Sequence, residues 1–109
     1  MIRLSGRLTE ADHKSHQTVP FDLPPGLTRL TLRLTLGPRR SPGAFYDNMV
    51  CLSLFGPNGA RGALHNTPRT EFEIEATRAT PGLLPGAIEP GRWIVGLDVF
   101  RLLGPVDWA

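Results

Sequence analysis

The chain has 109 residues, of which 40% are apolar and 20% are charged, and its formal net charge is +2 at pH 7. This length is typical of one domain with a single core, and the composition excludes intrinsic disorder. Gly (12) and Pro (11) make up about a fifth of the chain, which disfavours long helices and favours an all-β domain with many turns. We therefore expect one domain over residues 1–109.

Simple patterns exclude several classes of protein. No apolar stretch approaches the ~20 residues needed to span a membrane, and the N-terminus lacks the apolar core of a secretory signal. The single cysteine, Cys51, excludes an internal disulfide framework and a zinc site built from several cysteines. The arginines are scattered, whereas a nucleic-acid-binding face gathers them between aromatic side chains. These features predict a cytoplasmic protein with neither nucleic-acid nor membrane partners.

Alternation of apolar and polar residues, together with a nearly continuous apolar run over residues 49–55, predicts about seven strands. Successive side chains of a strand point to opposite faces, so residues 30–36 place four leucines on one face and polar residues on the other. The expected strands cover residues 2–8, 15–21, 30–36, 49–55, 71–76 and 92–99, with a last strand beginning at residue 106. No parallel βαβ rhythm accompanies them. We predict an antiparallel β-sandwich of jelly-roll or immunoglobulin-like type.

The segments between the expected strands carry strong turn signals. A helical turn is expected over residues 9–13, with Thr9 as its N-cap. Residues 56–62 are rich in glycine and predict a hairpin or loop turn, and residues 77–91 hold three Pro-Gly pairs that exclude any helix longer than a turn. The in-phase apolar residues predict a core of Leu30, Leu32, Leu34, Leu36, Leu52, Leu54, Phe72, Ile74, Trp93, Val95 and Leu97.

No set of residues in the sequence has the spacing of a catalytic or metal centre. His13 and His16 form an H-x-x-H pair, but a strand from Ser15 onward would separate their side chains, so both are interpreted as surface histidines. Asp47, Asn48 and Asp98 offer oxygen atoms but no calcium-loop pattern. The cysteine has no neighbouring base in the sequence. We expect no catalytic residue, metal or cofactor in this chain.

Three segments carry a resemblance to a known family. They read HQTVPFDLPPGLTRLTLRLTL (16–36), DNMVCLSLFGPNGARG (47–62) and ATPGLLPGAIEPGRWIVGL (79–97). Together they resemble the N-terminal β-sandwich domain that precedes the catalytic domain in CehA/McbA-type metallohydrolases of the polymerase and histidinol phosphatase (PHP) superfamily. The resemblance covers about residues 13–100. It departs from the family after Arg61-Gly62, where Ala63-Leu64-His65 replaces an aromatic and a small polar residue, and after Leu97, where Asp98-Val99-Phe100 replaces G-P-Y.

The resemblance implies a non-catalytic accessory domain. PHP catalysis needs several His and Asp/Glu residues beginning with an H-x-H pair, and this chain has no such pair. The expected partner is a PHP-type phosphoesterase domain in the same longer chain or in another subunit. The alternative is a free-standing module that binds carbohydrate or another ligand, for which Tyr46, Phe45 and Trp108 are the aromatic residues expected at the surface. The candidate interface or ligand residues are Arg61, His65, Tyr46, Ile94 and Phe100.

Two features predict a covered surface and a longer natural chain. Ile94 and Phe100 would give one strand an apolar outer face, which suggests a surface that another element covers. The strand that begins at Val106 reaches Ala109 after four residues, and a strand this short would leave part of its neighbour's edge unpaired. We therefore expect a continuation after Ala109 that completes the strand and then presents an H-x-H metal-binding segment.

Overall fold

The structure is a computed structural model that describes residues 2–12, 14–37, 43, 48–64, 71–102 and 104–109, with the backbone alone for Glu10, Phe100 and Arg101. The strands in this part of the chain are β1 (Gly6–Leu8), β2 (His16–Leu23), β3 (Arg29–Arg33), β4 (Leu36–Gly37), β5 (Met49–Gly56), β6 (Gly59–Leu64), β7 (Glu71–Glu75), β8 (Gly91–Arg101) and β9 (Val106–Trp108). A short 3-10 helix, η1 (Glu10–Asp12), joins β1 to β2. All strand pairs are antiparallel, which confirms the predicted all-β sandwich class.

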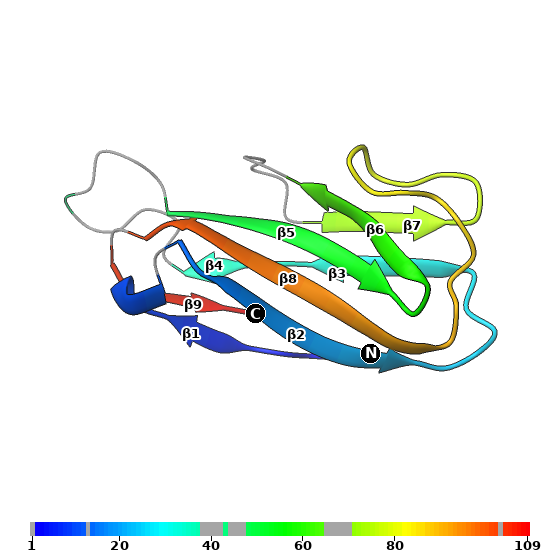
Figure 1. The fold of residues 1–109 in the computed structure, drawn as a ribbon, viewed down its shortest axis with the longest axis horizontal. Coiled ribbons are helices and arrows are strands. Elements are labelled where there is room, and N and C mark those ends of the chain that lie inside the picture. Colours follow the sequence, from blue (N-terminus) through cyan, green and yellow to red (C-terminus); the bar gives the residue numbers. More distant parts are fainter. Residues whose placement is uncertain (1, 13, 38–42, 44–47, 65–70, 103) are drawn as a thin grey trace.

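The first layer of the sandwich is a four-stranded sheet in the order β2-β8-β5-β6. The long strand β8 lies in the middle and pairs with β2 along one side and β5 along the other. The hairpin β5-β6 turns at Pro57 and Asn58. Figure 1 shows these strands running together along the length of the molecule.

The second layer is built from two ladders, β1-β9-β4 and β3-β7. The strands β3 and β4 follow each other along residues 29–37, so this run of chain pairs with β7 at one end and with β9 at the other. Two hydrogen bonds between the main chains of Thr35 and Ala109, 2.9 and 3.1 Å long, extend the pairing one residue beyond β9. The layer therefore has the order β1, β9, β4/β3, β7 (Figure 1).

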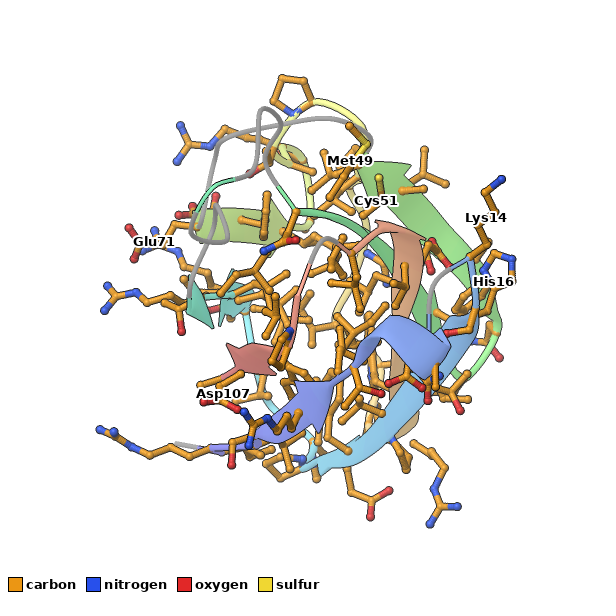
Figure 2. The ribbon with its side chains drawn as sticks, turned by 90° about the vertical axis from the view of Figure 1, so that its left-hand side faces the viewer. Lys14, His16, Met49, Cys51, Glu71 and Asp107 are labelled. Atoms are coloured by element: carbon orange, nitrogen blue, oxygen red, sulfur yellow. The ribbon has the colours of Figure 1, made fainter. Side chains whose placement is uncertain are left out.

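Apolar side chains from the two layers meet in two adjacent core clusters. The larger cluster surrounds Trp93, whose side chain is fully buried, and the smaller one surrounds Val106 near the other end of the sandwich. Every predicted core residue except Leu97 belongs to one of these clusters, although Leu32, Leu34, Leu36 and Val95 are only partly buried. Leu97 lies outside both clusters but is also buried, at 1% exposure. Figure 2 looks along the strands and shows the side chains that fill the space between the layers.

Residues 78–86 close one side of the sandwich. Their main chain bonds to β7 through Thr80 N–H and Glu73 C=O at 2.9 Å, and to β6 through Leu84 N–H and Arg61 C=O at 2.9 Å. The segment therefore covers the outer edges of β6 and β7, which belong to different layers. Covering an edge in this way protects it from pairing with another chain. On the opposite side, Pro20 lies within the edge strand β2, where its missing N–H blocks strand addition.

The sequence-based predictions differ from the structure in three places. The predicted strand 30–36 is divided into β3 and β4, because its two ends pair with different strands. Residues 59–64, interpreted as part of a turn, form β6. The predicted strand 2–8 forms only at Gly6–Leu8, and Ile2 and Leu4 are exposed. The turn after Thr9 is confirmed as η1, and the Asp12 carboxylate accepts a hydrogen bond from Thr9 N–H at 2.8 Å.

Candidate interaction surfaces

Arg61 is the centre of a buried polar cluster. It lies on β6 between Ala60, which pairs with Phe55, and Gly62, which pairs with Leu54, so it is the extra residue of a β-bulge. The guanidinium donates hydrogen bonds to the carbonyl oxygens of Ala87 (3.0 Å), Gly86 (3.1 Å) and Leu84 (3.3 Å). Five N–H donors in a rigid fork suit such a set of acceptors.

The same guanidinium also contacts Glu89 and Trp93. One nitrogen lies 3.4 Å from a carboxylate oxygen of Glu89, and the guanidinium carbon lies 5.1 Å from the centroid of the Trp93 ring. The Trp93 indole in turn donates a 2.8 Å hydrogen bond to the Glu89 carbonyl oxygen. The sequence named Arg61 as a candidate interface or ligand residue, and in the structure its guanidinium contacts the carboxylate of Glu89 in its own chain. Arg61 thus fastens residues 84–89 to the sandwich.

Ile94 lies on the outer face of the first layer. The strand pairing places Pro20 on β2 and Phe55 on β5 on either side of it. Pro20 is exposed, Ile94 is half-buried, and the Phe55 side chain remains 41% exposed. We call Pro20, Ile94 and Phe55 the apolar row. The next row, Thr18, Gly96 and Ser53, has small side chains, so this part of the face is flat.

The outer face of the second layer is charged. Arg29 is paired with Glu75 at 2.7 Å, and Arg33 with Glu71 at 2.8 Å, in each case directly across the β3-β7 ladder. Hydrogen bonds from Arg78 and Arg29 hold the pKa of the Glu75 carboxyl below its ordinary value. Opposite charges on facing residues stabilise such a ladder modestly in water. Figure 2 shows Glu71 at this surface, pointing away from the core. The outer face of the second layer therefore carries ion pairs, whereas the outer face of the first layer carries the apolar row.

A third row on the first layer brings together His16, Asp98 and Cys51. The strand order places Asp98 between the other two, and His16 Nδ1 lies 2.8 Å from an Asp98 carboxylate oxygen. A nucleophilic thiol needs direct contact with its base, whereas here the imidazole lies on the far side of the carboxylate. Cys51 is buried, at 4% exposure. The contact between His16 and Asp98 therefore links β2 to β8 at the surface, and Cys51 takes no part in it.

Three predicted candidates lie outside the described residues: Tyr46, His65 and the side chain of Phe100. The same holds for His13, Phe45 and Asp47, which the sequence analysis also considered. Within the described ranges, no three His, Cys, Asp or Glu residues are grouped so that they could hold a metal ion. No helix in these ranges is long and apolar enough to cross a lipid bilayer.

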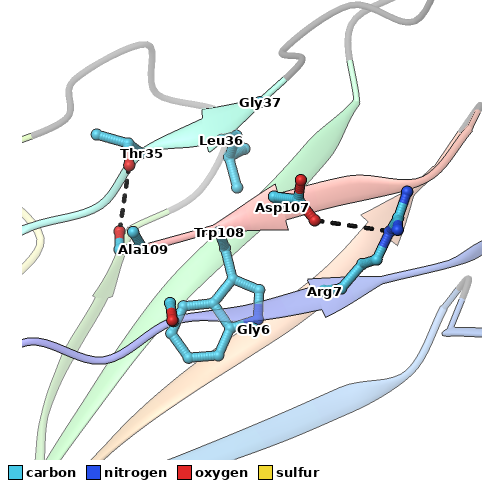
Figure 3. Close-up of a pocket in the computed structure, with 9 residues that line it drawn as sticks. Gly6, Arg7, Thr35, Leu36, Gly37, Asp107, Trp108 and Ala109 are labelled. Atoms are coloured by element: carbon cyan, nitrogen blue, oxygen red, sulfur yellow. Dashed lines mark hydrogen bonds and ion pairs between the residues drawn. The ribbon is translucent and has the colours of Figure 1, made fainter.

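An open groove lies where β1, β9 and β4 meet. It encloses about 670 Å³, and its lining includes Ser5, Gly6, Thr35, Trp108 and Ala109. Figure 3 shows the Trp108 ring lying across Gly6, its pairing partner. A Cβ atom built on Gly6 would come within 2.7 Å of the indole, so only glycine fits beneath this ring.

Sequence reasoning identified Ile94 but missed Pro20 and Phe55 as its neighbours. Pairing register decides which residues share a row, and alternation within one strand does not contain that information. The groove was also missed, because it depends on the meeting of three segments that lie far apart in the sequence: residues 5–7, 35–37 and 107–109.

Comparisons with known proteins found no similar protein: no family description, no curated sequence and no solved structure matches the chain.

Proposed function

We propose that this chain is a non-catalytic accessory domain that packs against a PHP-type metal-dependent phosphoesterase domain. The three segments that resemble the CehA/McbA accessory domain support this proposal on the sequence side. The structural support is the apolar row of Pro20, Ile94 and Phe55, which lies on a flat sheet face, whereas the opposite face of the sandwich carries paired charges. An exposed apolar patch on a small domain is typical of a contact surface.

The chemistry of the two faces gives the proposed interface its orientation. The face with Arg29, Arg33, Glu71 and Glu75 satisfies its charges within its own ladder and favours contact with water. The apolar row has no covering element among the described residues, and its burial against a partner would release ordered water. The catalytic domain therefore packs on the β2-β8-β5 face and leaves the β3-β7 face in solvent.

A binding measurement with a matched control tests this proposal. The purified chain is mixed with a CehA/McbA-type catalytic domain that lacks its own sandwich domain, and binding is followed by titration calorimetry. We expect a one-to-one complex that Phe55→Glu weakens at least about tenfold, since a charge replaces buried apolar area. Thr31→Glu, on the opposite face, serves as the control and leaves affinity unchanged. Absence of binding, or equal loss in both variants, contradicts the proposal.

A second function is supported by the groove beside Trp108. A free-standing module for carbohydrate would need an accessible aromatic ring in a hollow surface, and the groove offers one partly buried indole. A glycan array decides between the two functions. Binding that Tyr46→Ala or Trp108→Ala abolishes would favour the ligand-binding module, whereas no glycan binding is expected for the accessory domain.

A further inference from the structure

The turn between β5 and β6 carries an Asn-Gly sequence. Gly56 pairs with Gly59, so Pro57 and Asn58 are the two central residues of this turn (Figure 1). Lys14 is the only described non-glycine residue with a positive φ, whereas Gly59 has a φ of +132°. Negative φ angles at both central residues, with proline first and glycine after the second, are typical of a type I turn. The sequence Pro-Asn-Gly therefore accounts for the local structure.

The side-chain amide of Asn58 is accessible to water. Pro57, Asn58 and Gly59 are all exposed, and the Asn58 side chain makes no hydrogen bond within the part of the chain that the structure describes. A Cβ atom built on Gly59 would meet open space, so no other segment crowds this residue. Opening the end of a hairpin breaks few contacts and costs little free energy. The Asn58 amide and the main-chain nitrogen of Gly59 are therefore able to meet in the folded protein.

We propose that Asn58 is a site of spontaneous modification, at which asparagine converts to a mixture of aspartate and isoaspartate. The main-chain nitrogen of Gly59 attacks the side-chain carbonyl carbon of Asn58, and the new C–N bond closes a five-membered succinimide ring. The bond from that carbon to the side-chain nitrogen breaks, and this nitrogen leaves as ammonia with the proton lost from the Gly59 N–H. Water then opens the ring at either of its carbonyl carbons. Water is the only co-reactant.

The glycine that follows the asparagine favours ring closure. Because Gly59 has no side chain, its nitrogen is unhindered as a nucleophile, and its main chain tolerates the change of dihedral angles that the ring requires. Both products place a carboxylate in the turn, and isoaspartate also adds a methylene group to the main chain. The modification therefore adds a negative charge at the end of the first layer.

Asn48 provides an internal comparison. It is 2% exposed, and the next residue, Met49, has a side chain that hinders attack by its nitrogen. A buried residue reacts only after local unfolding, so the reactive population is small. The third asparagine, Asn66, lies outside the described residues and precedes threonine. The reaction is therefore expected at Asn58 rather than at Asn48.

Storage of the folded protein in neutral buffer at body temperature tests the proposal. Peptide mapping by mass spectrometry follows each asparagine, and a methyltransferase specific for isoaspartate, with labelled S-adenosylmethionine, detects that product. We expect conversion of Asn58 at least about tenfold faster than conversion of Asn48. Gly59→Ala should slow conversion of Asn58 by about tenfold or more. Gly26→Ala is the matched control, because Gly26 also has a positive φ and open space around an added Cβ but lies outside the turn; it should leave the rate unchanged.

A parallel sample kept unfolded in urea separates the effect of the fold from that of the sequence. Conversion of Asn58 in the folded protein within about tenfold of its rate in urea supports the proposal. Slower conversion would show that the hairpin protects Asn58, and it would overturn the proposal. Equal rates at Asn48 and Asn58, or an unchanged rate in Gly59→Ala, would overturn it as well. The experiment involves no partner domain, so its result is independent of the calorimetric test of the proposed function.

Discussion

The guanidinium of Arg61 lies over the ring of Trp93, 5.1 Å from its centroid. This contact joins β6 to β8 at the closed end of the sandwich, where the segment 84–89 passes over both. Because Arg61 is buried and bonds to three carbonyl oxygens of that segment, it serves as a structural fastening within the domain.

Removal of the Arg61 donors should destabilise the domain. Arg61→Met keeps the length of the aliphatic side chain but leaves the carbonyl oxygens of Leu84, Gly86 and Ala87 without their partner. We expect a loss of about 2–4 kcal/mol in the free energy of unfolding, measured by urea denaturation. Arg78→Gln, which removes an exposed ion pair with Glu75, serves as the control and should have a much smaller effect. Equal stability of Arg61→Met and the parent contradicts the fastening role.

Truncation of Trp93 should have the largest effect of any single substitution in the core. Its ring is fully buried, lies 6.5 Å from the ring of Phe21, and donates a hydrogen bond to Glu89. Trp93→Ala should cost about 3–5 kcal/mol, a large share of the stability of a small domain. The measurement is thermal and chemical unfolding followed by circular dichroism. A melting temperature within a few degrees of the parent would show that Trp93 is not a central core residue.

A close approach between β6 and the covering segment explains why residue 62 is glycine. Gly62 has a φ of +115°, and a Cβ atom there would overlap the carbonyl oxygen of Gly82 and lie 2.7 Å from Leu83 Cα. Gly62→Ala should therefore cost about 2 kcal/mol or more in unfolding free energy. Gly59→Ala is the matched control, because Gly59 also has a positive φ, of +132°, but an added Cβ would meet open space. If both variants lose the same stability, the close approach contributes nothing beyond backbone strain.

The Glu75 ion pairs make stability depend on pH. Hydrogen bonds from Arg78 and then Arg29 lower the pKa of the Glu75 carboxyl in the folded protein. A carboxyl with a lowered folded pKa contributes stability above its unfolded pKa, and this contribution disappears as the pH falls through the folded value. The difference in unfolding free energy between the parent and Arg78→Gln should therefore shrink on acidification. Carboxyl NMR titration of Glu75 checks the cause, since Arg78→Gln should move its pKa upward. An unchanged pKa would refute the assignment.

The sequence predicted where most strands lie but not how they pair. Alternation is strong in residues 30–36, 71–76 and 92–99, and each segment forms strand, because a half-buried strand needs a period of two. The same alternation cannot show that residues 30–36 change partners near Thr35. That change follows from the positions of β7 and β9, which lie far away in the sequence.

Strand β6 escaped prediction because its sequence has little side-chain pattern. Gly59–Leu64 contains two glycines and two alanines, which have low intrinsic strand preference. Its strand conformation comes from pairing with β5 on one side and with residues 82–84 on the other. Among the candidate site residues, Ile94 was predictable as an apolar residue on the outer side of its strand. The packing of Arg61 against Trp93 was not, since it depends on the bulge opposite Leu54 and Phe55.

The most direct test of the strand arrangement in the second layer is amide hydrogen exchange of the unmodified protein, followed residue by residue along β3. The main-chain groups of Glu73 and Glu75 bond to residues 78–86, so the residues in phase with Thr31, which lies opposite Glu73, point their N–H groups away from β7. The pairing geometry therefore predicts slow exchange for Leu30 and Leu32, whose N–H groups face β7, and fast exchange for Thr31 and Arg33. Equal protection at all four amides would show that β3 is paired along both edges, and it would contradict the strand order of the second layer.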